Sequence, residues 1–244
     1  MNNRASASPV AGLVEEGEAF RRLVAGSLRD GPSSFSPGET THGKGNARLE
    51  AFCDGVFAIA LTLLIIDIKV PAGATAGTSG DLWRALQHLL PSVFAFVLSF
   101  GSILIAWVNH HALLRRVHGS SMPFVYANGF LLLTIVFVPF PTALLGETLW
   151  TNHASPSVVL YCATIALQSV AWYLLGRAAL APEPLTRNER AAALVRDGSR
   201  AGLSASAFYT ACAVAAVWAP HAIAALITLV WVFWTLYGIE LDRK

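Results

Sequence analysis

The chain has 244 residues, of which 55% are hydrophobic and 13% charged, and its mean hydropathy is +0.54. An ordinary soluble domain is about 45–50% apolar and about 25% charged. Charged residues also concentrate in residues 1–50 and 177–200, so the remainder has too few to solvate a water-facing surface. A soluble globular enzyme is therefore excluded. The formal net charge of +2 gives no basic field for binding nucleic acid.

Residues 1–46 are predicted to be a disordered cytoplasmic tail. Gly, Ser and Pro recur along this segment, and such a composition cannot bury enough apolar surface to offset the entropy lost on ordering. It also contains no uninterrupted apolar run typical of a cleaved secretory signal. We therefore expect residues 47–244 to form the membrane domain and its own spans to direct insertion.

Long uncharged runs predict the membrane spans. A helix needs about 20 apolar residues to cross about 30 Å of hydrocarbon. Three runs are long enough for one span each, and a fourth is long enough for two, divided at Pro220. A further span carries Asp54 within its first turns. The sequence predicts an all-α integral membrane protein with six transmembrane helices, at about 48–70, 84–112, 122–145, 155–178, 200–218 and 221–240.

The distribution of basic residues predicts the orientation of these spans. With six spans, 15 of the 17 Lys and Arg residues fall on one side, and only Lys69 and Arg84 fall on the other. Cytoplasmic segments hold the excess of Lys and Arg in membrane proteins. Both termini are therefore predicted to be cytoplasmic, in a multi-pass protein of the cell membrane.

The first predicted span has an apolar face and, away from it, a carboxylate. Helical geometry places Leu63 and Ile66 within about 40° of Ile59, and Thr62 at about 60° from it. Asp54 lies about 140° from Ile59. Periodicity alone leaves two interpretations of the Ile/Leu face, exposure to lipid or a functional lining. Asp54 indicates either an ion pair with Arg48 or a bond to a neighbouring helix, because an ionisable group in a span is costly.

The second predicted span ends in Trp107, Val108, Asn109, His110 and His111. Adjacent histidines point about 100° apart on a helix, so they cannot chelate one metal ion from one face. We therefore expect no metal site here. A hydrogen bond between His110 and Asp54 is the favoured interpretation, because both lie near the same end of their spans.

The segment from Arg48 to Leu64 reads Arg-x-x-x-Phe-Cys-Asp followed by an apolar run that contains Thr62. It resembles the signature of the transmembrane protein 175 family, which comprises potassium-permeable channels of lysosomes and prokaryotes. Trp107, His110 and the six-span count extend the resemblance to residues 48–240. The family pattern has Ser where this chain has Cys53, and a thiol is a weaker hydrogen-bond donor than a hydroxyl.

The resemblance implies a role for each motif residue. The first helix of that family lines the pore, and its constriction is a hydrophobic residue five positions after the motif Asp, here Ile59. Leu63 and Ile66 follow as further apolar turns of the pore, and Thr62 lies near the constriction. The resemblance assigns a structural network that fixes this helix to Arg48, Phe52, Cys53, Asp54, Trp107 and His110.

The function implied by the resemblance is a homotetrameric, potassium-selective cation channel that is not an enzyme and needs no cofactor. Its expected partners are K⁺ ions, further copies of the chain and the lipid bilayer, with no nucleic acid. The alternative is a secondary or proton-coupled transporter that uses Asp54 and His110 as a relay. A membrane enzyme or haem protein built on His110 and His111 is a second alternative.

Overall fold

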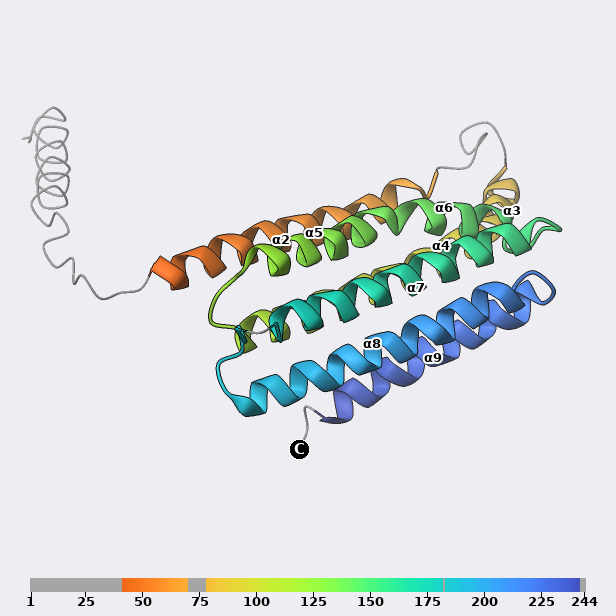
Figure 1. The fold of residues 1–244 in the computed structure, drawn as a ribbon. Coiled ribbons are helices and arrows are strands. Elements are labelled where there is room, and N and C mark those ends of the chain that lie inside the picture. Colours follow the sequence, from red (N-terminus) through yellow and green to blue (C-terminus); the bar gives the residue numbers. More distant parts are fainter. Residues whose placement is uncertain (1–40, 70–77, 182, 242–244) are drawn as a thin grey trace, which may run out of the picture. The chain divides into compact units, whose positions relative to one another are not determined.

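The computed structural model describes residues 41–69, 78–181 and 183–241, with side chains described from residue 46 to residue 232 within these ranges. The described chain is helical, apart from one isolated bridge between Val117 and Thr186 (Figure 1). The helices are α2 (Thr41–Ile66), α3 (Ser79–His88), α4 (Leu90–Arg116), α5 (Met122–Phe137), α6 (Pro139–Thr148), α7 (Ala154–Ala179), α8 (Glu189–Ala215) and α9 (Pro220–Leu241).

Four helical segments are long and apolar enough to cross a membrane: Asn46–Ile66, Leu90–Arg116, Met122–Thr148 and Ala154–Ala179. They correspond to the first four predicted spans. The last two predicted spans fall on α8 and α9 but are not among these candidates. The first half of α8 carries Arg196, Asp197 and Arg200, and α9 is apolar but short over its described side chains, Pro220–Val232. The all-helical class is thus confirmed, with four candidate spans in the described residues.

Two predicted spans have breaks that periodicity did not indicate. The segment predicted to begin at residue 84 starts in α3, and the chain turns at Leu89 before α4 begins at Leu90 with Pro91 in its first turn. The span predicted at 122–145 consists of α5 and α6, which meet at Val138. Pro139 follows this junction and lacks the backbone N–H that would continue the helical hydrogen bonds, while Val138 itself keeps helical dihedral angles.

The limits of two helices also differ from prediction. α2 begins at Thr41, so residues 41–46 of the predicted tail are helical, and residues 1–40 lie outside the described residues. α8 begins at Glu189, well before the predicted start at residue 200. Asn188 accounts for this start, because its side chain caps the helix by accepting a hydrogen bond from the Ala191 N–H at 2.8 Å.

α7 and α8 form a closely packed hairpin whose contact depends on small residues. A Cβ atom built at Gly176 would lie 2.9 Å from the Cβ of Ser199, and one at Gly202 would lie 3.2 Å from the Ser169 carbonyl oxygen. At the α7–α8 loop, the His118 N–H donates to the Leu185 carbonyl at 2.8 Å. This hydrogen bond ties the α7–α8 loop to the α4–α5 loop.

α2 packs against α4 and α5, and it lies beside α5 in Figure 1. Its inward-facing side chains join those of α4 and α5 in a core cluster that contains Phe57, Ile103 and Ile135. The core therefore fixes one face of α2 and leaves the opposite face outside.

Candidate pore helix and its anchoring network

The two faces of α2 differ sharply in burial. Cys53, Phe57, Ala60 and Leu64 are at most 1% exposed. These positions are spaced by four, three and four residues, which places them on one face of a helix. This face fixes the position of α2 against the rest of the bundle.

The opposite face carries the side chains that the resemblance assigned to the pore. Ile59 is 59% exposed, Leu63 38% and Ile66 69%. Thr62 is also exposed, and its hydroxyl donates to the Ile59 carbonyl oxygen at 2.9 Å. The structure therefore places all four residues together on a face that the single chain leaves uncovered.

Asp54 makes a polar bond between α2 and α4. The indole N–H of Trp107 donates to Oδ1 of Asp54 at 2.8 Å, and both side chains are half-buried. The same indole stacks on His111 with ring centroids 6.0 Å apart. His111 in turn pairs with Glu50, with 2.9 Å between Nδ1 and Oε1. Two polar contacts thus join α2 to α4 within about one turn of each other.

A second polar link joins α2, α4 and α5 in the buried core. Oδ1 of Asn128 lies 2.7 Å from Nε2 of His110, and its amide donates to the Cys53 thiol at 3.1 Å. His110 and Asn128 are each 1% exposed, and Cys53 is fully buried. The His110 ring also lies against Phe57, with centroids 5.4 Å apart. Cys53 therefore accepts a hydrogen bond here, whereas the sequence indicated only a weak donor.

Asn128 is the residue that sequence reasoning missed. The available signal was an amide in the middle of the apolar span predicted at 122–145, since polar side chains in membrane helices commonly bond across helices. The favoured bond between His110 and Asp54 is not formed, because Trp107 bonds Asp54 and Asn128 bonds His110. Spacing along one helix cannot indicate which neighbouring helix supplies the partner.

Arg48 and Phe52 lie apart from these bonds. Arg48 is exposed, and no ion pair joins it to Asp54 in the part of the chain that the structure describes. Phe52 is 62% exposed and lies within about 20° of Ile59 around the helix. The structure thus brings together Cys53, Asp54, Trp107 and His110 of the predicted network, but not Arg48 or Phe52.

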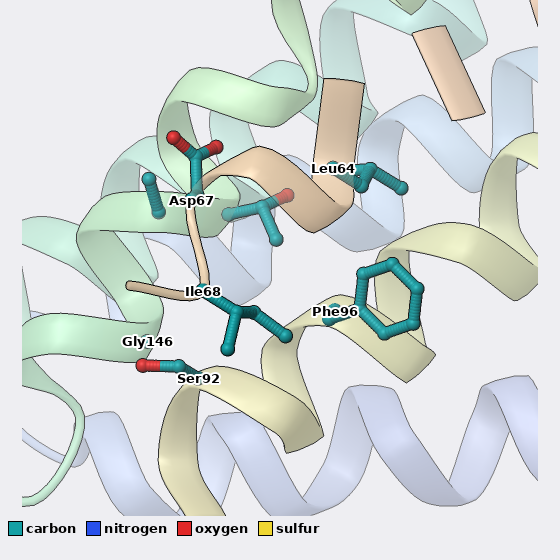
Figure 2. A pocket seen from close by; sticks show the side chains of 8 residues that line it. Leu64, Asp67, Ile68, Ser92, Phe96 and Gly146 are labelled. Atoms are coloured by element: carbon teal, nitrogen blue, oxygen red, sulfur yellow. The ribbon is translucent and has the colours of Figure 1, made fainter. Parts of the chain in front are cut away.

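A small pocket lies at the other end of α2, between α2, α4 and α6 (Figure 2). Leu64, Asp67 and Ile68 line it together with Ser92 and Phe96 of α4 and with Thr142, Ala143 and Gly146 of α6. A Cβ atom at Gly146 would lie 2.8 Å from the Cα of Ser92, so this glycine allows α4 and α6 to approach closely. The pocket marks where the end of α2 packs against these helices.

The His, Cys, Asp and Glu side chains give no grouping of three or more that could hold a metal ion within the described residues. His110 and His111 point to different partners, Asn128 and Glu50. The geometry of this site is that of a helix fixed by one buried face, with exposed apolar side chains that include Ile59 and Ile66.

Comparison with known proteins shows that most of α2 lies in a segment that matches a protein family. A family model described as the endosomal/lysosomal potassium channel TMEM175 matches residues 48–139. This range contains the whole anchoring network and the exposed face of α2.

Curated relatives match over about half of the chain. A potassium channel of Chamaesiphon minutus is 50% identical over 114 residues, which are 47% of this chain and 56% of the relative. A potassium channel of Streptomyces collinus is 43% identical over 135 residues, which are 53% of this chain and 64% of the relative. A bovine relative named endosomal/lysosomal proton channel TMEM175 is 32% identical over 145 residues, which are 56% of this chain and 30% of the relative. The matched segments therefore span less than two thirds of these relatives, all of which are named ion channels.

Solved structures extend the similarity over most of the chain. The crystal structure of the potassium channel MtTMEM175 has a TM-score of 0.55 at 18% identity, covers 88% of this chain and 99% of its own, and indicates a shared fold alone. The crystal structure of a lysosomal potassium-selective channel TMEM175 homolog from Chamaesiphon minutus has a TM-score of 0.70 at 33% identity. The match covers 79% of this chain and 97% of that homolog. With this identity over nearly the whole of the homolog, the chain belongs to the TMEM175 family.

Proposed function

We propose that the protein is a homotetrameric potassium channel whose pore is lined by the exposed face of α2. The observation that carries this proposal is the opposition of the two faces of one helix. Cys53, Phe57 and Leu64 fix α2 to its own bundle, while Ile59 and Ile66 are the most exposed side chains of the Ile/Leu face. The names of two relatives, the potassium channels of Chamaesiphon minutus and Streptomyces collinus, support the choice of ion.

A closed ring of identical chains is the assembly that this geometry favours. One helix with one apolar face cannot enclose a path for ions by itself. In a ring with cyclic symmetry, each subunit presents the same face to the central axis. Four copies of Ile59 would then form the constriction, followed by rings of Leu63 and Ile66.

The proposed selectivity depends on the cost of removing water from the ion. An Ile ring offers no ligands, so a cation passes with part of its water shell disturbed. K⁺ holds its water less tightly than Na⁺ because its charge is spread over a larger radius, so its penalty is smaller. An apolar constriction can also gate by dewetting.

The hydrogen bond of Thr62 sharpens its proposed role. Its proton is directed to the Ile59 carbonyl, so the hydroxyl oxygen keeps its lone pairs for other groups. This orientation suits contact with a partly dehydrated cation one turn along the helix. We therefore assign Thr62 as a pore hydroxyl beside the Ile59 ring.

The proposal includes six spans with both termini in the cytoplasm of a cell whose plasma membrane holds the channel. α8 and α9 supply the fifth and sixth spans. The basic residues support this orientation, since the charged start of α8, with Arg190 and Arg196, lies on the same side as Arg115 and Arg116. The channel needs no cofactor in this account.

Proton-coupled transport is the alternative function. It requires a relay through Asp54 and His110, and these side chains bond to separate partners, Trp107 and Asn128. Proton permeation is worth measuring because the bovine relative is named a proton channel. A pH-sensitive dye inside the liposomes would detect H⁺ entry, and uptake of K⁺ that requires an opposing H⁺ flux would favour the transporter instead.

Paired K⁺ and Na⁺ fluxes in liposomes test the proposed pore. Ile59→Asn should wet the constriction, raise total flux and lower the ratio of K⁺ to Na⁺ flux. Ile65→Asn is the matched control, because Ile65 is 52% exposed but lies about 120° from Ile59 around the helix. Leu61, on the opposite side of α2, is a poorer control because it packs against the core.

The control should leave the K⁺ to Na⁺ ratio near that of the wild type. Equal effects from the two substitutions would contradict a pore lined by Ile59, and so would no change for Ile59→Asn. Cross-linking in mild detergent tests the assembly separately and should give a ladder ending at four chains. A monomer that still conducts would contradict the ring.

A further inference from the structure

α3 is an amphipathic helix with no buried residue of its own. Leu82, Trp83 and Leu86 are 38%, 68% and 42% exposed. Leu82 and Leu86 lie about 40° apart around the helix, with Trp83 beside them. Arg84 and His88 lie about 200° from Leu82 and Leu86, respectively. The helix thus separates an apolar face from a polar one.

Local contacts rather than tertiary burial hold α3 together. The Thr78 side chain accepts a hydrogen bond from the Asp81 N–H, and the Asp81 carboxylate accepts from the Thr78 N–H at 2.9 Å. Asp81 also pairs with Arg84 at 2.8 Å. The Thr78 hydroxyl and backbone N–H both donate to the Asp81 carboxylate, and these two hydrogen bonds lower the pKa of Asp81.

The position of α3 matches a membrane boundary. It comes directly before α4, one of the candidate spans, and α2 ends at Ile66 on the other side of the connection. Figure 1 shows α3 turned out of line with α4 at the end of that helix. If α4 crosses the bilayer, α3 lies across that direction, near the level where the hydrocarbon ends.

The exposed apolar face of α3 continues on α4. Leu90, Val93 and Val97 of α4 are 53%, 41% and 49% exposed. They follow Leu86 along the chain and belong to a helix that is long and apolar enough to face acyl chains. The lipid that covers these α4 residues in a membrane can therefore also cover Leu82 and Leu86.

We propose that α3 lies in the interfacial layer of the bilayer, with Leu82, Trp83 and Leu86 inserted between phospholipid headgroups and the start of the acyl chains. Trp favours this layer because it combines a large apolar ring with a polar N–H. An amphipathic helix buries its apolar face about 5–10 Å into this boundary. The bilayer thereby holds α3 in place at the start of α4.

The attraction is apolar rather than electrostatic. In the proposed six-span topology, the Lys and Arg residues on this side of the membrane are Lys69 and Arg84. Arg84 pairs with Asp81, and Lys69 pairs with Glu147 at 3.3 Å. α3 therefore recognises the phospholipid interface without requiring anionic headgroups. The proposal depends on α4 crossing the membrane and not on which ion passes.

An environment-sensitive fluorophore attached to Leu86→Cys or to His88→Cys tests the proposal in the full-length protein. Both residues are exposed, and the three native cysteines are buried, so the new thiol reacts selectively. The protein is placed in vesicles of neutral phosphatidylcholine. Quenching is measured with aqueous iodide and with lipids that carry a nitroxide near the headgroup or at the chain end.

At Leu86 we expect blue-shifted emission, stronger quenching by the shallow nitroxide than by the deep one, and protection from iodide. At His88 we expect iodide quenching. Two results would overturn the proposal: iodide quenching of equal strength at both positions, or no quenching at Leu86 by lipid or iodide, which would mean that another protein surface covers it. A depth at Leu86 that changes when anionic lipid is added would contradict the apolar mode of attachment.

Discussion

α2 and the α7–α8 hairpin are held in the bundle by different kinds of contact. Between α7 and α8, Gly176 and Gly202 allow the two backbones to approach closely over a long interface, which contains one hydrogen bond from the Ser199 hydroxyl to the Tyr173 carbonyl oxygen at 3.1 Å. α2 is held instead by separate polar bonds, from Trp107 to Asp54 and from Asn128 to Cys53, beside a narrow apolar face.

The difference lies in what each contact fixes. Small-residue packing fixes the distance between two helices. A hydrogen bond to a particular side chain also fixes the rotation of the helix about its own axis. Rotation decides which face of α2 is exposed, and hence which side chains can line a path for ions. The family model matches residues 48–139, which include α2 from residue 48 onward and its polar bonds but not the α7–α8 hairpin.

The largest expected effect comes from Asn128. Asn128→Leu removes both buried bonds and leaves His110 without its partner, and an unsatisfied buried polar group costs about 1–3 kcal/mol. The thermal midpoint of the purified protein in detergent should fall clearly. Asn109→Leu is the matched control, because Asn109 is exposed on α4, and it should change the midpoint little. Equal midpoints for the two variants would contradict the role of Asn128.

Substitution of Asp54 distinguishes a hydrogen bond with Trp107 from an ion pair with Arg48. Asp54→Ala leaves the half-buried Trp107 N–H without its acceptor, and we expect a loss of about 1–3 kcal/mol in the free energy of unfolding. Asp54→Asn keeps an oxygen at that position and should recover most of the loss. Arg48→Ala should lie within about 0.5 kcal/mol of the wild type because Arg48 is exposed. A loss for Arg48→Ala as large as for Asp54→Ala would instead indicate an ion pair between them.

Much of this organisation could be predicted from the sequence. Uncharged runs of sufficient length located three of the four candidate spans, and the first was placed by extending a shorter apolar run to include Asp54. Angles around one helix placed Ile59, Leu63 and Ile66 together, because positions within a helix follow from its pitch. Membership of the family followed from the motif around Asp54.

The partners across helices could not be predicted in the same way. The sequence favoured a bond between His110 and Asp54 because both lie near the same end of their spans. In the structure, Asn128 of α5 is the hydrogen-bond partner of His110 instead. The break at Leu89 lies inside an uncharged run that was interpreted as one span, although the polar Gln87 and His88 precede it and Pro91 follows it. Both differences depend on how helices meet, which periodicity within one segment does not determine.

We expect a smaller loss of stability from a substitution at the close contact between α7 and α8. Gly176→Ala would place a methyl group 2.9 Å from the Ser199 Cβ, so α7 and α8 must shift, with an expected loss of about 1 kcal/mol. Gly198→Ala is the matched control on α8, since nothing lies within 4 Å of its added methyl group. It should stabilise the protein by about 0.5–1 kcal/mol because Ala favours the helix. Changes of the same sign for both variants would show that close approach at Gly176 does not matter.

The smallest effect concerns α3. Hydrogen bonds from Thr78 lower the pKa of Asp81, so its cap contributes stability above the ordinary carboxyl pKa of 3.8 and loses it as the pH falls through the lowered value. Amide exchange in residues 79–88, corrected for intrinsic rates, should therefore become faster only below about pH 4. In Asp81→Asn this pH dependence should disappear. Faster exchange already near neutral pH in the wild type would contradict this role for the cap.

Reaction of single cysteines with a charged, water-soluble thiol reagent tests whether α2 lines the ion path. Ile66→Cys and Ile65→Cys are adjacent and both exposed, at 69% and 52% in the wild type, but they point about 100° apart. If the face of α2 that carries Ile59 and Ile66 lines the ion path, the reagent should block K⁺ flux through Ile66→Cys liposomes and leave flux through Ile65→Cys and wild-type liposomes unchanged. Unblocked flux through Ile66→Cys, or equal block of both variants, would contradict the account.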